Sequence, residues 1–195
     1  MADIQTTADL TRGMIRKVLR SETHLIEAHF LRLEADARQR RFGHDVSDQY
    51  LHDYAMHAAD FGNLTFGYFM DGDIHGIAEL RHGERAFRHT AEVAFSVERP
   101  FSNLGIATRL MARIIRSARN RGVLHLLLVC LTGNLKMQAI ARHYGGDLHI
   151  ESGSMVADIT PERRDYASIA SEFIDDHMIF VQAAFDLQTR LARIA

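Results

Sequence analysis

The chain has 195 residues, of which 47% are hydrophobic and 25% charged, and its formal net charge is −2. These values are ordinary for a single soluble globular domain with a sizeable core. The charge disfavours a nucleic-acid binder that works through bulk positive charge, but it permits a small anion held by a few local groups. On this charge we expect no nucleic-acid partner. No run of about 18 apolar residues occurs, so we also expect no membrane partner.

Cysteine and histidine usage gives further expectations. Cys130 is the only cysteine, so no intrachain disulfide can form, which fits a reducing cytoplasm. The first ten residues, MADIQTTADL, show no positive cluster followed by an apolar run, so we expect no signal peptide there. The twelve histidines show no convincing ligand spacing with a third partner. We therefore expect a cytoplasmic protein without a metal.

Hydrophobic periodicity predicts the elements of the first half of the chain. The spacing changes from helical to alternating after about residue 60, and the tripeptide DGD at 71–73 predicts a hairpin turn. In chain order we expect a short strand at 13–20, a helix at 22–35, a helix capped by Ser47, and strands at 64–70, 74–81 and 89–98.

The second half begins with a helical stripe between Gly105 and Gly122. The nearly continuous apolar run at 123–131 is typical of a strand covered on both faces, so 89–131 reads as a strand–helix–strand crossover with a parallel pair. A helix follows from Asn134 to near Tyr144, and a closing hairpin occupies 147–159.

A last helix is expected from the Thr160–Pro161 junction to about Leu191. Thirty helical residues span roughly 45 Å, which is more than one small domain usually covers. We therefore divide the chain into a domain at 1–159 and a helical extension at 160–195, and we expect the extension to bend or to meet a partner.

The segment SNLGIATRL at 102–110 lies between the strand at 89–98 and the next helix. A helix amino terminus offers unpaired backbone N–H groups and about half a positive charge, and glycine lets an anion approach them closely. One interpretation is therefore a phosphate site at Gly105. The other, given equal weight, is that Gly105 only turns the chain into the helix. Neither a GxGxxG motif nor a lysine of the nucleotide-triphosphatase kind is present.

At this loop the sequence resembles the GNAT superfamily of acyl-coenzyme A N-acyltransferases. Ser102 to Ala107, SNLGIA, is similar to that superfamily's [QR]-x-x-G-x-[GA] motif, with serine at the usual Gln or Arg position. Asn134 to Gly146, NLKMQAIARHYGG, is similar to its N-x-x-[AM]-x-x-[LIA]-x-x-x-x-G element. Together with RFG at 41–43, these residues most resemble the bacterial protein-lysine acetyltransferase branch. The implied fold is α/β, with a mixed, mostly antiparallel, splayed sheet and flanking helices. The C-terminal helical extension is additional to the core of that superfamily.

The resemblance implies acetyl-CoA as cofactor and assigns the residues that hold it. Backbone groups of the strand near Phe95 to Val97 would pair with the pantetheine arm and hold the oxyanion, and Asn134 would contact the arm near the thiol. Asn134 also suits a helix cap, and both roles can hold at once. The full set of expected cofactor-binding residues is Phe95, Ser96, Val97, Ser102, Asn103, Leu104, Gly105, Ile106, Ala107, Thr108, Asn134 and Met137.

Acyl transfer to an amine requires that the attacking nitrogen lose a proton, because a lysine ammonium has a pKa near 10.4. A carboxylate beside the cleft can accept it, directly or through water. Glu92 is the first candidate, supported by the resemblance, and Glu79 is the second. The competing interpretation of Glu92 is an inward or edge glutamate held by an arginine. His82 and His89 rank third, and Cys130 reads as a packing residue.

The expected function is an N-acetyltransferase that passes acetyl from acetyl-CoA to an amine, such as a protein lysine, in a ternary complex. Many superfamily members place a tyrosine acid where this chain has Ala141, so the general acid is unassigned. That departure, with Ser102, keeps a second hypothesis open: a non-catalytic acyl-CoA sensor or interaction module. The C-terminal helix would either pair two copies in a homodimer or roof the acceptor site.

Overall fold

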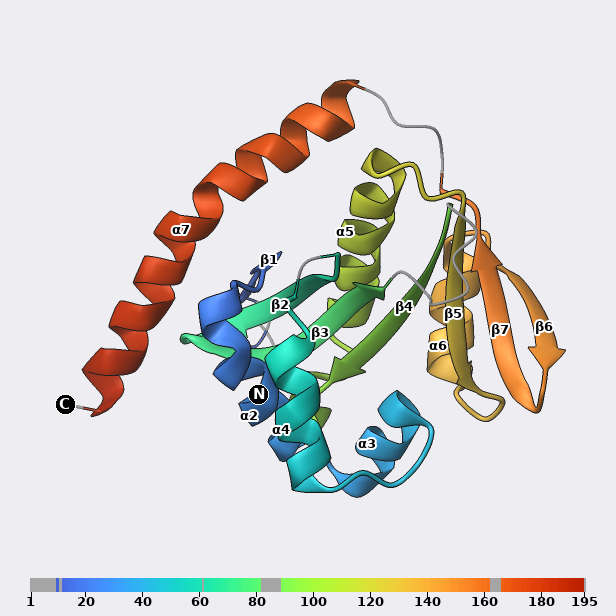
Figure 1. The fold of residues 1–195 in the computed structure, drawn as a ribbon, viewed down its shortest axis with the longest axis horizontal. Coiled ribbons are helices and arrows are strands. Elements are labelled where there is room, and N and C mark those ends of the chain that lie inside the picture. The colour runs from blue at the N-terminus through green and yellow to red at the C-terminus, as the bar shows by residue number, and fades with distance from the viewer. Residues whose placement is uncertain (1–9, 11, 61, 82–88, 162–165, 195) are drawn as a thin grey trace, which may run out of the picture.

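A single mixed sheet organises the protein, which we describe from a computed structural model covering residues 10, 12–60, 62–81, 89–161 and 166–194 (Figure 1). The strand order is β1-β2-β3-β4-β5-β7-β6. The β4–β5 pair is parallel and each of the other neighbouring pairs is antiparallel. The strands are β1 (Met14–Lys17), β2 (Leu64–Met70), β3 (Asp73–Arg81), β4 (Thr90–Val97), β5 (His125–Leu131), β6 (Asp147–Glu151) and β7 (Ser154–Ile159).

Helices cover both faces of this sheet. The helix α5 packs on β2, β3 and β4, and α6 packs on β5, β6 and β7. On the other face α2 packs on β3 and α4, and α3 reaches β4 and β5. The helices are η1 (Arg20–Glu22), α2 (Thr23–Arg32), α3 (Ala35–Phe42), α4 (Asp48–His57), η2 (Arg99–Phe101), α5 (Ile106–Asn120), α6 (Leu135–His143) and α7 (Tyr166–Ile194).

Local sequence explains most of these elements. Asp71 and Gly72 adopt φ of 56° and 87°, the left-handed pair that a two-residue hairpin turn requires, so the predicted β2–β3 hairpin is confirmed. The side chain of Ser47 accepts a hydrogen bond from the Tyr50 amide, which confirms the predicted cap of α4. The strand–helix–strand crossover with a parallel pair is also confirmed, by β4, α5 and β5.

The helix α3 is a difference from the sequence prediction. Its sequence, ADARQRRF, has no apolar stripe and it contains no fully buried residue, so hydrophobic periodicity could not reveal it. It ends at Gly43, whose φ is 79°, in the usual left-handed conformation of a helix end. Its contacts with β4 and β5 place it over the centre of the sheet, where the candidate site lies.

Two apolar clusters form the core, one on each side of the sheet. The first joins the strands to the buried stripe of α5, which includes Leu110, Met111 and Ile114. The second joins α2 and α4 to Phe69, Ile74 and Ile77. The helix α7 lies apart from both clusters and crosses β1 and α5 (Figure 1). None of the helices within the described ranges is both long enough and apolar enough to span a bilayer.

Candidate active site

The sheet opens at its parallel pair. The β4–β5 pairing runs from Thr90 and His125 to Val93 and Leu128. Beyond Val93, β4 continues to Val97 paired only with β3, and β5 continues to Leu131 paired only with β7. The two strands therefore form a wedge whose apex lies at Val93, and part of the β4 backbone edge faces that wedge without a strand partner.

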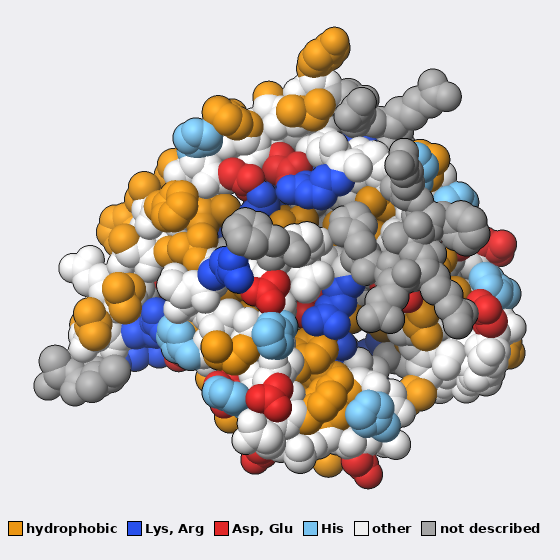
Figure 2. Space-filling view, in the orientation of Figure 1, with side chains coloured by type: hydrophobic (Ala, Val, Ile, Leu, Met, Phe, Trp, Pro, Cys, Tyr) orange, Lys and Arg blue, Asp and Glu red, His pale blue; other side chains and the backbone are white. Residues whose placement is uncertain are grey.

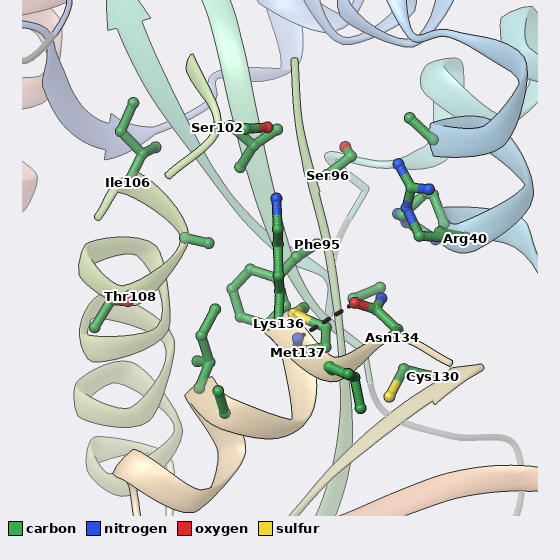
Figure 3. A pocket seen from close by; sticks show the side chains of 18 of the residues that line it. Arg40, Phe95, Ser96, Ser102, Ile106, Thr108, Cys130, Asn134, Lys136 and Met137 are labelled. Carbon is green, nitrogen blue, oxygen red and sulfur yellow. Dashed lines mark hydrogen bonds between the residues drawn. The ribbon is translucent and has the colours of Figure 1, made fainter. Parts of the chain in front are cut away.

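A cavity of about 1020 Å³ fills this wedge and passes through the sheet. Figure 3 shows Ile106 and Thr108 of α5 on one side of the cavity and Arg40 of α3 on the other, with Phe95 and Lys136 between them. The cavity is therefore bounded by helices from both faces of the sheet. One long ligand could enter from the α5–α6 side while a second reaches its end from the α3 side.

The amino terminus of α5 borders the cavity with exposed backbone. Gly105 precedes the helix with φ of 73°, and no side chain caps the first turn. The first backbone hydrogen bond of the helix joins the Arg109 amide to the Gly105 carbonyl at 3.0 Å. The amides of residues 106–108 consequently lack helical acceptors and carry the positive end of the helix dipole. This arrangement suits a phosphate group.

The structure brings the predicted cofactor residues together. With the exception of Leu104, which packs against the core, all of them line the cavity. Asn134 accepts a hydrogen bond from the Met137 amide at 3.3 Å, so its predicted role as a cap of α6 is confirmed (Figure 3). Contact of these residues with a cofactor stays a prediction.

Glu79 is buried, with a relative exposure of 1%, and is fully engaged. The guanidinium of Arg41 donates to its carboxylate, and the Tyr54 hydroxyl donates at 3.0 Å. Arg81 adds a nitrogen at 3.6 Å. A carboxylate held by these donors is poorly placed to accept a substrate proton, and it does not line the cavity. Its geometry indicates a structural ion pair that holds α3 and α4 on the sheet.

Glu92 differs from Glu79 in every respect that matters to a base. Its side chain is exposed, and it makes no hydrogen bond or ion pair with another described residue. Strand alternation puts it on the same face as Ala94 and Ser96, which line the cavity. Glu92 does not itself line the cavity; it lies one pleat, about 7 Å, before Ala94, next to the apex of the wedge.

Four cationic residues line the cavity that were not predicted as site residues. Arg40 and Arg41 belong to the unpredicted α3, Arg99 belongs to η2, and Lys136 belongs to the exposed first turn of α6. In the sequence, the RFG segment included Arg41, and the basic run RQRRF includes both Arg40 and Arg41. Arg113 of α5 forms an ion pair with Asp175. His82 lies outside the described residues, and the His89 imidazole contacts the Gly122 carbonyl at 3.0 Å, away from the cavity.

A buried histidine anchors the cavity wall. His29 of α2 is fully buried, and its ring nitrogens lie 2.8 Å from the Ser96 hydroxyl and 3.0 Å from the Glu98 carboxylate. Burial lowers the pKa of His29, partly offset by Glu98. The pKa of Glu98 is held well below its usual range by hydrogen bonds from His29 and His75 and from Arg32, which outweigh its burial. A neutral imidazole therefore bridges β4 to α2.

These two shifts predict acid sensitivity. Below about pH 6.5 the unfolded state protonates its histidine while buried His29 stays neutral, so folding stability falls by up to about 1.4 kcal/mol per pH unit. Below about pH 4.5 protonation of Glu98 in the unfolded state adds to the loss, since a depressed carboxyl pKa stabilises only above its unfolded value. The free energy of unfolding, measured by urea titration at several pH values, should depend less on pH between 7 and 5 for His29→Gln than for the wild type. The exposed control His143→Gln should keep the wild-type pH dependence. The same pH dependence in all three proteins would contradict this assignment.

The structure places no tyrosine of the α6 region where it could act as the general acid. Ala141 is fully buried in the core, and the Tyr144 hydroxyl donates to the Thr108 carbonyl at 2.9 Å. Burial raises the pKa of Tyr144, and that of the Cys130 thiol as well. Cys130 lines the cavity as a neutral packing side chain. Among the described residues no group of three or more side chains suited to binding a metal ion occurs.

A mixed sheet splayed at its parallel pair, with an uncapped helix at the opening, defines the α/β acyltransferase class of fold. Residues 28–145 match the Acetyltransferase (GNAT) family. This match covers more than half of the chain, and the chain therefore belongs to the GNAT family of acetyltransferases, whose cofactor is acetyl-CoA. A search of curated proteins found no match.

Solved structures share the same fold. The GNAT domain of PAT from S. lividans gives a TM-score of 0.66 at 19% identity, over 76% of this chain and 90% of that chain. A protein from Salmonella typhimurium, solved with its cofactor acetyl-CoA, gives 0.60 at 14% identity, over 80% and 97%. Ribosomal-protein-alanine N-acetyltransferase from Brucella melitensis gives 0.59 at 20% identity, over 74% and 96%. At these identities the similarity establishes the splayed α/β fold, as expected from the sequence.

Proposed function

We propose that the protein is an N-acetyltransferase that passes the acetyl group of acetyl-CoA to an amine in a ternary complex. The observation that carries this proposal is the wedge between β4 and β5, which has an uncapped helix amino terminus at its mouth and an exposed carboxylate at its apex. Family membership supplies the acetyl-CoA chemistry, and the arrangement of this chain's residues supports the direction in which the two substrates approach.

The proposed cofactor path follows the charge and shape of the cavity. The diphosphate would lie on the amides of Ile106, Ala107 and Thr108, where the helix dipole is positive. Lys136, exposed at the cavity and without a described partner, would add a cation on the α6 side. The pantetheine arm would then follow the unpaired edge of β4 from Val97 toward Phe95, which places the thioester near the apex.

Glu92 is the proposed base. An amine entering from the α3 side would meet the thioester at the apex, within one pleat of this carboxylate. Its proton would pass to Glu92, directly or through water, as the nitrogen bonds to the acyl carbon and the bond to sulfur breaks. The thiolate that leaves takes up a proton from water, since no tyrosine faces it from the described part of α6.

For the acceptor we propose a primary amine of the lysine type. The proposal rests on the resemblance of the RFG and Asn134 segments to the protein-lysine acetyltransferase branch, and on the similarity to the GNAT domain of PAT from S. lividans. A peptide carrying lysine is therefore the first acceptor to test.

Cofactor binding can be tested with two glycines that share one conformation. Gly105 and Gly122 both have φ of 73°, and a Cβ at either would meet no protein atom within 4 Å. Alanine should therefore cost similar backbone strain, about 1 kcal/mol, at both positions. Calorimetric titration with acetyl-CoA should show at least a tenfold weaker affinity for Gly105→Ala, through lost charge-assisted amide contacts. Gly122→Ala should bind like wild type, and equal affinities of both variants would contradict the phosphate site.

A second candidate function is a sensor that binds acyl-CoA without chemistry. It is favoured by two departures from the superfamily pattern, Ser102 in the loop and buried Ala141 in α6. The two functions separate in one assay. Cofactor binding with no thiol released across peptide, polyamine and amino-acid acceptors would select the sensor, whereas acceptor-dependent thiol release would select the enzyme.

A further inference from the structure

The helix α7 presents its charged side to its own domain. Glu172 accepts hydrogen bonds from Ser117 at 2.8 Å and from Arg121 at 2.7 Å, and Asp175 pairs with Arg113 and Arg116 of α5. Further along, Asp186 binds buried Arg16 of β1 at 2.7 Å. Arg193 reaches Asp71 at 2.8 Å. These contacts recur at helical spacing, so a ladder of polar bonds fixes one face of α7 on α5, β1 and the β2–β3 turn.

The opposite face of α7 is apolar and exposed. Within α7, Ile179 is the large apolar side chain that the domain buries, with 4% exposure, whereas Phe180 is 71% exposed. Figure 2 shows hydrophobic side chains gathered along the outer side of this helix. We call this set the outer face; it comprises Tyr166, Ile169, Phe173, Ile174, Met178, Phe180, Val181, Phe185, Leu187 and Leu191.

This orientation inverts the usual amphipathic helix, which buries its apolar stripe against its own core. Isolated exposed apolar residues need no explanation, but a contiguous face of this size marks an interaction surface. The face cannot turn inward without breaking the ladder of polar bonds made by Glu172, Asp175 and Asp186. An occupant must therefore come from outside the domain.

Area and charge indicate what that occupant is. Phe and Tyr side chains each carry about 150–250 Å², so the exposed parts of the whole outer face amount to roughly 1,000 Å². This exceeds the surface of about 800 Å² that each partner buries in a standard stable interface. The outer face carries no lysine or arginine, and α7 holds four acidic residues against two arginines, which disfavours an anionic membrane.

The helix dipole favours a second α7 running in the opposite direction. The acids and arginines of α7 are already paired with the domain on its inner side, so the outer face itself is uncharged. Antiparallel pairing places the positive end of one helix dipole beside the negative end of the other. A two-fold axis makes one such face self-complementary.

We propose that the protein is a homodimer in which two α7 helices pair antiparallel through the outer face, about a two-fold axis near Phe180. The cavity lies elsewhere, since no described residue of α7 lines it. The alternative expectation from the sequence, that this helix roofs the acceptor site, has no support from the contacts of α7 with α5 and β1. Each subunit would thus keep an open site of its own.

A matched pair of substitutions tests the surface with the full-length chain. Ile174 of the outer face is 63% exposed, and Ile150 of β6 at the other end of the sheet is 67% exposed. Sedimentation velocity at tens of micromolar should give twice the 22.1 kDa chain mass for wild type and for Ile150→Glu, and the monomer mass for Ile174→Glu. Phe180→Glu should act like Ile174→Glu, since burying a charge at the axis is unfavourable in both copies.

Disulfide trapping tests the direction of the pair. The only native cysteine, Cys130, is buried, so engineered thiols can be followed alone under mild copper–phenanthroline oxidation. In the antiparallel arrangement Phe180→Cys should cross-link to its own copy, whereas Ile169→Cys should not, because the two copies of residue 169 lie at opposite ends. Cross-linking of Ile169→Cys alone would overturn the antiparallel pairing.

Three results would overturn the dimer itself. The first is a monomeric wild type over the whole concentration range, and the second is a dimer that survives both Ile174→Glu and Phe180→Glu. The third is a monomer that co-sediments with phosphatidylcholine vesicles, which would assign the outer face to lipid. None of these readouts depends on catalysis, so a failure of the proposed acetyl transfer would leave this test intact.

Discussion

Replacement of Glu92 by glutamine should lower kcat by about 10²–10⁴, the usual contribution of a positioned general base. The exposed carboxylate lies beside the apex of the wedge and is not committed to any described partner, so it can take the proton of an attacking amine. Glutamine keeps the size of the side chain and removes only its basicity. Thiol release from acetyl-CoA with a lysine peptide as acceptor measures the effect, and calorimetry should show an unchanged cofactor affinity.

The pH profile separates this role from a structural one. Above about pH 10 a lysine amine loses its proton to solvent, so the deficit of Glu92→Gln should shrink as the pH rises toward that value. Glu151→Gln, at an exposed carboxylate on β6, is the matched control and should retain wild-type turnover. A Glu92→Gln protein with unchanged turnover per bound cofactor at every pH would remove Glu92 from the mechanism.

The sequence was informative wherever local chemistry determines local structure. The DGD turn, the Ser47 cap, the Gly105 helix start and the apolar run of β5 each depend on a few neighbouring residues, and the structure has all four. The apolar run also predicted the parallel pairing of β4 with β5, which the structure has. The cavity between the diverging ends of these two strands follows from that pairing. The expected burial of β5 on both faces is wrong, because Leu126, Leu128 and Cys130 are buried whereas Val129 on the other face is 52% exposed.

Other features depend on contacts between distant residues and could not be predicted. The polar helix α3 is held over the cavity by the bond between Arg41 and Glu79, which are far apart in the sequence. The same bond distinguishes Glu79 from Glu92. Both are strand glutamates that look alike in sequence, but Glu79 is buried and paired whereas Glu92 is exposed. The hydrogen bond between His29 of α2 and Ser96 of β4 likewise forms only when the chain has folded. Hydrophobic periodicity carries no information on contacts between residues so far apart in the sequence.

The helix α7 illustrates the difference between finding an element and orienting it. Its helical spacing was visible in the sequence, and the helix occupies Tyr166–Ile194. Periodicity alone would turn its apolar stripe inward. Arg16, Arg113 and Arg116 fix the opposite orientation, because each is paired with an acid of α7. The charged residues of the domain thus decide which side of this helix faces outward.

Replacement of Arg41 by methionine should destabilise the protein by about 3–5 kcal/mol, the usual cost of leaving a buried charge without its partner. Arg41 and Glu79 have side-chain exposures of 6% and 1%, so Glu79 would remain buried with only Tyr54 and the more distant Arg81 beside it. Urea unfolding measures the loss. Adding Glu79→Gln to Arg41→Met should recover part of it, since that change removes the unpaired charge.

The neighbouring residue supplies the control for this prediction. Arg40 also lines the cavity, but its side chain is 46% exposed and its partner Asp36 lies on the surface four residues earlier. Such exposed pairs contribute little, so Arg40→Met should change the free energy of unfolding by less than about 0.5 kcal/mol. If both variants unfold alike, the bond between Arg41 and Glu79 does not hold α3 in place, and the α3 side of the cavity must be anchored by other contacts.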